Sequence, residues 1–167
     1  MRTTYYHGSA VQTDSPRGWL VSALLFPACV YYLLNPASFT ILDKASFYMY
    51  EMGHYGFAIF GGSTQYAGGS IGQLVIPLLL VFFFLVYEYA FGLQVFLFWL
   101  GQNLVNLSTY LSHTSAPHPH PVGVQDWQML VATLGVSDYS LYIGALLFAV
   151  GCMCFLASTL TPRFVEN

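Results

Sequence analysis

The sequence predicts an all-helical protein that crosses a membrane several times, for two reasons. First, 56% of its 167 residues are hydrophobic and only 7% are charged, whereas about a quarter of the residues of a soluble domain are charged. Second, the apolar residues gather in stretches of about 20, the length that a helix needs to cross a bilayer. We therefore expect residues 1–167 to form a single transmembrane domain, a helical bundle of four or five spans.

Charge and cysteine content narrow the range of partners. The net charge of −3 is too small to favour nucleic acid as a partner, so bilayer lipids and other membrane proteins are the expected ones. The three cysteines, Cys29, Cys152 and Cys154, all fall in predicted spans. We interpret them as small packing residues rather than as a disulfide framework.

The first expected element after a short polar tail (residues 1–17) is a span over residues 19–34. Its margins carry Trp19 and Tyr31, as expected where aromatic rings lie at the level of the lipid headgroups. Pro27 is expected to kink this helix, and Pro36 follows its end.

The second expected segment covers residues 43–60 and is shorter and less apolar than the first. A helix that its neighbours bury is more credible here than one that faces lipid. Residues 61–70 contain two copies of Gly-Gly-Ser, which predict a break in the helix, either a tight turn or a re-entrant loop. A re-entrant second segment gives four spans and a transmembrane one gives five.

Two further spans are expected over residues 71–90 and 92–111. The second of them carries amide side chains in its second half, Gln102, Asn103 and Asn106. Asn103 and Asn106 are three residues apart, so they lie on one helical face. Amides inside a span bind neighbouring helices or line a site.

Residues 113–138 are expected to form the one substantial extramembrane loop, and residues 139–160 the last span. The loop contains His118 and His120 between prolines. Such a segment could hold a metal ion, but we interpret it as a stiff, exposed connector, because the prolines keep it extended.

The chemistry of the chain centres on Glu51 and His54. Ionisable side chains are costly inside a membrane, so they are candidates for function. The two residues are three apart and share one face of a helix. Their spacing matches the second half of His-Glu-x-x-His, in which two histidines hold zinc and the glutamate activates its water. The first histidine of that motif is replaced by Tyr50.

Several fragments, taken in order, extend this comparison. They are Glu51-Met52-Gly53-His54, Gly-Gly-Ser at 68–70 with Gln-Leu-x-x-Pro at 73–77, Trp-x-Gly-Gln-x-Leu-x-Asn at 99–106, and Asp126-Trp127. The set resembles a group of small bacterial polytopic membrane proteins related to intramembrane zinc metallopeptidases, whose motif is His-Glu-x-Gly-His. The resemblance implies a location in the bacterial inner membrane.

The resemblance also implies roles for individual residues. Glu51 would be the general base and His54 a zinc ligand, with Asp126, Asn103 or Asn106 as groups that complete the site. Tyr50 and Gln102 would support it. Catalytic zinc normally has three protein ligands, so the replacement of a ligand by Tyr50 predicts that the peptidase chemistry has been lost.

We therefore expect a non-catalytic membrane protein with a zinc-peptidase-like fold and no bound cofactor, which acts as a structural or accessory subunit of a larger membrane complex. His54 would then bond Glu51, an asparagine of the fourth span or a backbone carbonyl. One alternative is a membrane-embedded zinc metallopeptidase with an unorthodox ligand set. Another is a pigment- or haem-binding subunit, because Gly53 and Gly56 leave space beside His54 for a tetrapyrrole.

Overall fold

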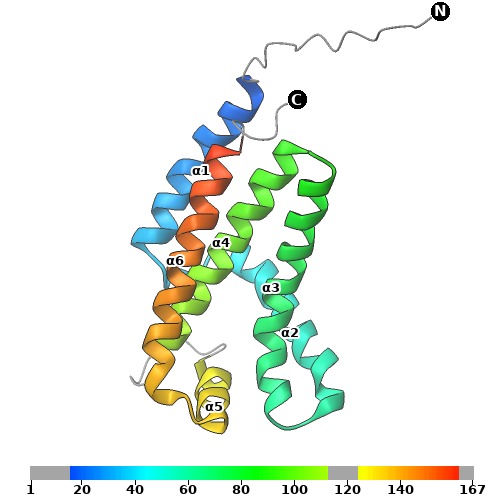
Figure 1. The fold of residues 1–167 in the computed structure, drawn as a ribbon, viewed down its shortest axis with the longest axis vertical. Coiled ribbons are helices and arrows are strands. Elements are labelled where there is room, and N and C mark those ends of the chain that lie inside the picture. Colours follow the sequence, from blue (N-terminus) through cyan, green and yellow to red (C-terminus); the bar gives the residue numbers. More distant parts are fainter. Residues whose placement is uncertain (1–15, 113–123, 162–167) are drawn as a thin grey trace, which may run out of the picture.

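The described residues of the structure, a computed structural model, form an all-helical bundle (Figure 1). They are residues 16–112 and 124–161, and no strand occurs among them. Along these two described ranges, six α-helices and two 3-10 helices follow one another: α1 (Pro16–Leu34), α2 (Ile41–Phe57), η1 (Ala58–Phe60), α3 (Ser63–Val86), α4 (Ala90–Ser112), α5 (Val124–Leu134), η2 (Ser137–Tyr139) and α6 (Ser140–Leu160). The predicted fold class is confirmed at this level.

Three helices of the described residues are long and apolar enough to cross a membrane: α3, α4 and α6. The apolar part of α1, Gly18–Leu34, is shorter. Helix α2 has 17 residues and carries Asp43, Lys44 and Glu51. The expected number of four or five spans therefore depends on α1 and α2, which do not have the length and composition of the other three.

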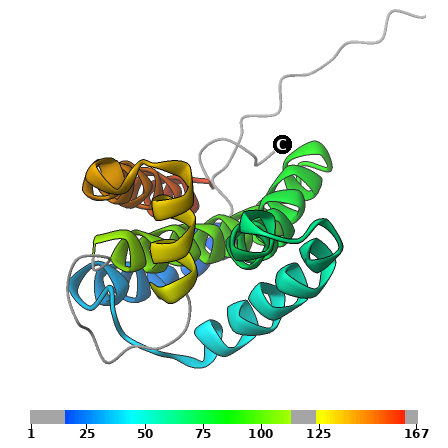
Figure 2. The ribbon, with the colours of Figure 1, turned by 90° about the horizontal axis from the view of Figure 1, so that it is seen from below.

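Helix α4 is the central helix of the bundle. It packs against α1, α3 and α6, and the view from below shows it between them (Figure 2). Every residue from Leu100 to Ser108 is buried. In the apolar stretch of α4 that could cross a membrane, 67% is buried inside the protein, compared with 22% of the corresponding stretches of α3 and α6. The amide side chains of α4 therefore face other helices rather than lipid.

Helices α4 and α6 meet through glycines and aromatic rings. A methyl group added at Gly101 of α4 would lie 3.0 Å from the backbone oxygen of Gly151 in α6, so the two backbones approach closely. Phe98, Phe155, Tyr32 and Cys29 form the buried apolar core beside this contact. All three cysteines are free, consistent with their interpretation as packing residues.

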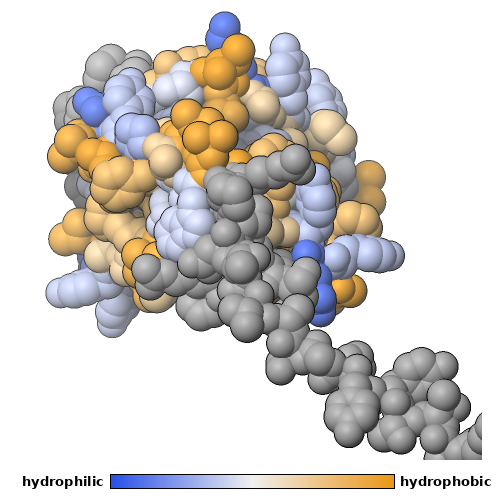
Figure 3. All heavy atoms as spheres, turned by 90° about the horizontal axis from the view of Figure 1, so that it is seen from above, coloured by the Kyte–Doolittle hydropathy of each residue, from blue (hydrophilic) through white to orange (hydrophobic). Residues whose placement is uncertain are grey.

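Helices α2 and α3 also pack through glycines. A methyl group at Gly53 would lie 2.0 Å from the backbone oxygen of Gly68, and one at Gly72 would lie 2.5 Å from that of Met49. Small residues permit this close approach of helices in membranes. Large hydrophobic side chains of α3 and α6 are exposed, and the end of the bundle seen from above shows hydrophobic side chains interspersed with hydrophilic ones (Figure 3).

The structure adds detail to two segments of the sequence-based prediction. The break expected over residues 61–70 is confined to Gly61 and Gly62, which have positive φ angles of 65° and 58°, and α3 begins at Ser63. The next glycines, near Gly68, are helical because they form the contact with α2. The loop expected over residues 113–138 contains α5 and η2. His113, His118 and His120 lie outside the described residues.

Candidate functional site

The buried residues of α2 lie on one side of this helix, facing the bundle. Its buried residues are Asp43, Ser46, Tyr50 and Gly53, spaced by three or four as one helical face requires. Thr40 caps the helix: its hydroxyl oxygen accepts from the backbone N–H of Leu42, and Asp43 completes a capping box. The same face therefore carries two polar clusters, one at each end.

The first cluster joins α2 to α5. The hydroxyl of Tyr50 donates a hydrogen bond to Oδ2 of Asp126, and Nε2 of His54 lies 3.2 Å from the same oxygen. The rings of Tyr50 and His54 meet edge to face, with centroids 4.5 Å apart. Tyr50 is 4% exposed, whereas the His54 and Asp126 side chains are 18% and 27% exposed. The cluster thus lies at the margin of the bundle, with its tyrosine inside.

The contacts of His54 determine what must lie between it and Asp126. Its Nδ1 is 2.7 Å from the backbone oxygen of Gln65, which can only accept, so Nδ1 carries a proton. A neutral imidazole has only one N–H, yet Nε2 faces a second oxygen, that of Asp126. A further proton on Nε2 or on Oδ2 would make this contact favourable, and so would a cation that binds both atoms from one side.

Helix α3 closes this cluster on one side. A methyl group at Gly69 would lie 2.5 Å from Nε2 of His54 and 2.6 Å from Cε2 of Tyr50. Only glycine leaves room there for both rings in these positions. The Gly-Gly-Ser fragment that suggested a turn therefore serves as the surface against which the histidine and the tyrosine pack.

Glu51 does not join this cluster. Its side chain is half-buried, and it makes no hydrogen bond or ion pair with the residues that the structure describes. Of the three partners expected for His54, the structure shows the backbone carbonyl, that of Gln65, and not Glu51 among the described residues; Asp126 is a further neighbour.

The second cluster surrounds Asp43, which is 3% exposed. Its Oδ1 accepts from Nε2 of Gln102 at 2.5 Å and from Nδ2 of Asn106 at 2.8 Å. Its Oδ2 accepts from the backbone N–H and the hydroxyl of Thr40 at 2.6 and 2.7 Å. The Thr40 hydroxyl is also 2.6 Å from that of Tyr32. Asp43 therefore joins α2 to α4 and to the end of α1.

Two amides of α4 belong to this second cluster, and the three that the sequence singled out have their printed bonds outside the first. Gln102 and Asn106 bind Asp43, and Asn103 accepts a hydrogen bond from Gln73 of α3 at 2.9 Å. The structure thus brings together His54, Asp126 and Tyr50 from the expected site residues. It places Asn106 and Gln102 at a different carboxylate and Asn103 beside Gln73, so these amides do not complete a site at His54.

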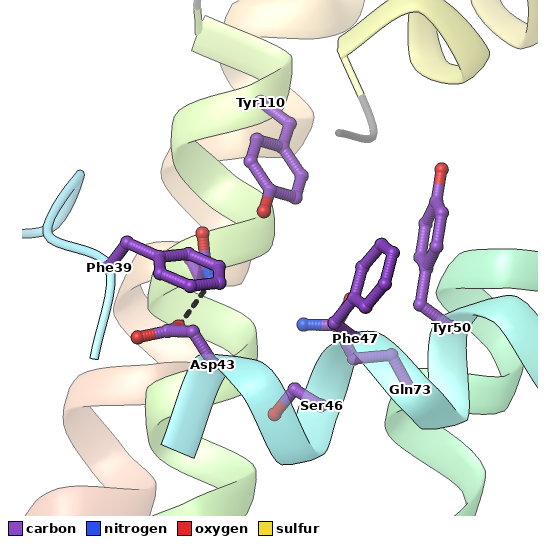
Figure 4. Close-up of a pocket in the computed structure, with 8 residues that line it drawn as sticks. Phe39, Asp43, Ser46, Phe47, Tyr50, Gln73 and Tyr110 are labelled. Atoms are coloured by element: carbon purple, nitrogen blue, oxygen red, sulfur yellow. Dashed lines mark hydrogen bonds between the residues drawn. The ribbon is translucent and has the colours of Figure 1, made fainter. Parts of the chain in front are cut away.

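A small cavity lies beside Asp43 (Figure 4). Its volume is about 20 Å³, enough for one water-sized particle. Its polar lining comes from Asp43, Ser46, Gln73, Asn106 and Tyr110, and its apolar walls from Phe39, Phe47 and the ring of Tyr50. The hydroxyl of Tyr110 points toward Asp43, whereas that of Tyr50 points away from it (Figure 4) and donates to Asp126.

Sequence reasoning missed Asp43, although two signals mark it. Thr40 and Asp43 have the spacing of a capping box before an apolar run. Asp43 also precedes Tyr50 by seven residues and His54 by eleven, which places all three on one helical face. Asp43 was instead interpreted, together with the adjacent Lys44, as a pair of charged residues at the start of the second segment.

The described residues contain no group of three His, Cys, Asp or Glu side chains placed to hold a metal ion. At the first cluster the possible donors are Nε2 of His54, Oδ2 of Asp126 and the phenol oxygen of Tyr50. Imidazole and carboxylate are common zinc ligands, so two of the three donors fit zinc. Comparison with protein-family models, curated proteins and solved structures gave no match for this chain.

Proposed function

We propose that this chain is a non-catalytic integral membrane protein whose fold derives from that of an intramembrane zinc peptidase, and that it serves as an accessory subunit of a larger complex, in a bacterial inner membrane. The observation that carries the proposal is the hydrogen bond from Tyr50 to Asp126. It links the helix of the degenerate motif directly to the carboxylate that the resemblance assigns to the metal site.

The length of tyrosine explains how this bond replaces a metal. A phenol reaches beyond an imidazole at the same position by about the length of one zinc–nitrogen bond, which is about 2.0–2.1 Å. The hydroxyl of Tyr50 can therefore contact Asp126 where a histidine would need a metal ion between them. In this interpretation tyrosine substitutes for both the lost ligand and the ion, and keeps α5 against α2.

The position of Glu51 supports the loss of chemistry. A general base must reach the water or proton on which it acts. Glu51 makes no polar contact with His54, Asp126 or Tyr50 among the described residues. The catalytic arrangement is thus unsupported at two positions, the first ligand and the base.

The role as a subunit is supported by the apolar outer helices. Large hydrophobic side chains of α3 and α6 are exposed, among them Leu79, Phe82 and Leu146, which are 61–64% exposed. Such surfaces suit lipid tails or the helices of other membrane proteins. The small extramembrane mass suits a subunit held within a larger assembly.

A restored histidine tests the proposed descent. We expect the purified wild-type protein to contain no stoichiometric zinc and Tyr50→His to bind about one zinc per chain, because it completes His-Glu-x-Gly-His. Tyr50→Phe is the matched control: it removes the same hydrogen bond, restores no ligand and should bind no zinc. Failure of Tyr50→His to take up zinc, in a folded protein, would remove the support for a degenerate metal site.

Native purification tests the role as a subunit. In mild detergent, the chain should migrate with a larger assembly at a fixed ratio to defined partners. A stable, partner-free monomer would contradict that part of the proposal and leave the test of descent unaffected.

The metallopeptidase alternative is favoured by one distance. Two ligand atoms on a tetrahedral zinc ion lie about 3.3 Å apart, given bonds of about 2.0–2.1 Å, and Nε2 of His54 lies 3.2 Å from Oδ2 of Asp126. Stoichiometric zinc in the wild-type protein, with proteolysis that Glu51→Gln abolishes, would establish this alternative. The tetrapyrrole alternative is less favoured, because both ring nitrogens of His54 face protein oxygen atoms.

A further inference from the structure

We propose that the outer face of α2 binds a transmembrane helix of another protein, and that this helix carries an aspartate or a glutamate opposite Lys44. The outer face is formed by Ile41, Lys44, Tyr48, Met52 and Tyr55, on the side of α2 away from its buried residues. The inference rests on the proposed function as a subunit, and it identifies the surface and the chemistry of the partner.

The outer face of α2 is apolar and aromatic apart from Lys44. Its four other side chains are 65–82% exposed, and they follow one another at spacings of seven, four and three residues, as one side of a helix requires. Helix α2 lies at the edge of the bundle, where α3 is its main neighbour (Figure 2). In a membrane, lipid or another protein therefore covers these side chains.

Lys44 places a positive charge within this apolar surface. It is exposed and lies three residues after Ile41 and four before Tyr48, so it shares their side of the helix. The carboxylate of the preceding residue, Asp43, points into the bundle, where it binds amides of α4. The ammonium group therefore meets whatever covers the outer face of α2.

Contacts with α4 place Lys44 inside the apolar stretch. Asp43 binds Gln102 and Asn106, which lie 10 and 6 residues before Ser112, the end of the α4 span. These separations are about 15 and 9 Å along the helix. A lysine side chain has five bonds of about 1.5 Å beyond its Cα and extends less than about 7.5 Å. Its ammonium group therefore remains at the depth of the apolar stretch.

Contacts with α3 give a similar depth. The two helices run antiparallel (Figure 1), and a methyl group at Gly72 would lie 2.5 Å from the backbone oxygen of Met49. Gly72 is 14 residues before Val86, the end of the α3 span, which is about 21 Å. Lys44 is five residues beyond Met49, so it lies about 7.5 Å closer to that end. The remaining distance of about 13 Å exceeds the reach of the side chain.

The charge of Lys44 decides which occupant suits the outer face of α2. Charged side chains at this depth are costly against lipid, and they pair with an opposite charge in protein or face water. A second copy of this chain, related by a two-fold axis along the membrane normal, would place its own Lys44 at the same depth, and like charges across an interface repel. A helix with one carboxyl group and apolar neighbours matches both the ammonium group and the apolar side chains around it.

Carbodiimide coupling tests the pairing on the full chain in its native membrane. Dicyclohexylcarbodiimide enters the bilayer and converts a carboxyl group into an O-acylisourea. A lysine amine in contact with it then loses a proton and displaces dicyclohexylurea, which leaves an amide bond. We expect mass spectrometry to find Lys44 joined to an Asp or Glu within an apolar stretch of a different protein. Lys44→Arg is the matched control: it keeps the charge and the assembly but forms no such amide.

Charge reversal tests whether the pairing holds the complex together. In mild detergent, Lys44→Glu should lower the fraction of the chain that migrates with its partner by about tenfold or more, because two carboxyl groups then oppose each other. Asp138→Lys, which reverses an exposed charge elsewhere, should leave that fraction unchanged. Lys44 is exposed, so we expect both purified variants to keep the helical circular dichroism and the Tm of the wild type.

The outcomes separate this inference from the proposed function. An assembly that Lys44→Glu leaves intact would overturn the inference, because the partner then binds another face, and would leave the role as a subunit standing. A cross-link from Lys44 to a carboxyl group of this same chain or of a second copy would also overturn it. A partner-free monomer in the native membrane would contradict the role as a subunit itself.

Discussion

Adding a single methyl group to α2 should have opposite effects at two positions three residues apart. At Gly53 the new carbon would lie 2.0 Å from the backbone oxygen of Gly68, 2.8 Å from its carbonyl carbon and 3.1 Å from Cα of Gly72. At Gly56 it would meet no atom within 4 Å. Gly53→Ala and Gly56→Ala are therefore a matched pair on one helix.

The magnitude follows from the contact distance. Carbon and oxygen atoms in close contact are about 3.3 Å apart, so α2 and α3 must separate locally by about 1.3 Å to accept the methyl group at Gly53. The obstructing atoms are backbone atoms, so rotation of a side chain cannot relieve the clash. Overpacking of this kind costs about 1–3 kcal/mol. Both variants gain about 0.5–1 kcal/mol from replacing a helical glycine.

The difference between the two variants isolates the overpacking cost, because the helix-propensity gain is common to both. We expect Gly56→Ala to be more stable than the wild type by about 0.5–1 kcal/mol and less sensitive to detergent denaturation. Gly53→Ala should lie below Gly56→Ala by about 1–3 kcal/mol. Equilibrium unfolding in SDS-containing mixed micelles, followed by circular dichroism, measures both. If Gly53→Ala proved as stable as Gly56→Ala, the close contact of α2 with α3 would be refuted.

Four other substitutions test the remaining helix contacts by the same unfolding assay. Ser158→Ala should cost about 0.5–1.5 kcal/mol, because the buried Ser158 hydroxyl donates to the backbone oxygen of Gln94 at 2.8 Å; an unchanged stability would argue against that contact between α6 and α4. Trp99→Phe should lower the stability by a similar amount, about 1 kcal/mol, since the indole N–H donates to the hydroxyl of Ser46 at 3.1 Å. Adding Ser46→Ala to Trp99→Phe should lower the stability little further, because the hydrogen bond is already lost. Gly101→Ala should destabilise by about 1–3 kcal/mol, because the new methyl would lie 2.8 Å from a ring atom and 3.0 Å from a backbone oxygen of α6; stabilisation would mean that α6 can move away without cost.

The apolar composition was sufficient to predict the helical class, and the amides of α4 were sufficient to predict its inward orientation. Gln102, Asn103 and Asn106 are all buried, because polar groups within a span need protein partners. Local sequence was misleading at Gly68 and Gly69, where glycine indicates a break unless another helix packs against it. That packing is a tertiary contact with α2, which local sequence does not encode.

Helix α5 was missed for a related reason. Its 11 residues are too few for a span, and the prolines that precede them suggested an extended connector. Val131 is 4% exposed, so α5 is fixed by packing on the bundle rather than by its own length. Short helices gain most of their stability from such packing.

The candidate site was predicted in part. His54 was singled out because an ionisable side chain is costly inside an apolar run. The structure places Oδ2 of Asp126, 72 positions later in the chain, 3.2 Å from Nε2 of His54. That contact was expected from the resemblance and not from spacing. The carboxylate that Asn106 and Gln102 bind was not identified, because any inward-facing amide can serve several partners.

The two polar clusters account for how α2 can lie against an apolar bundle. Asp43, Tyr50 and His54 would each be costly to bury alone, but Asp43 is bound by α4 and the other two meet Asp126 of α5. The ring of Tyr50 also forms a wall of the Asp43 cavity, so one residue borders both clusters. A change at position 50 therefore acts on both ends of the helix. Tyr50 thus provides Asp126 with a hydrogen-bond donor and also closes one side of the cavity at Asp43.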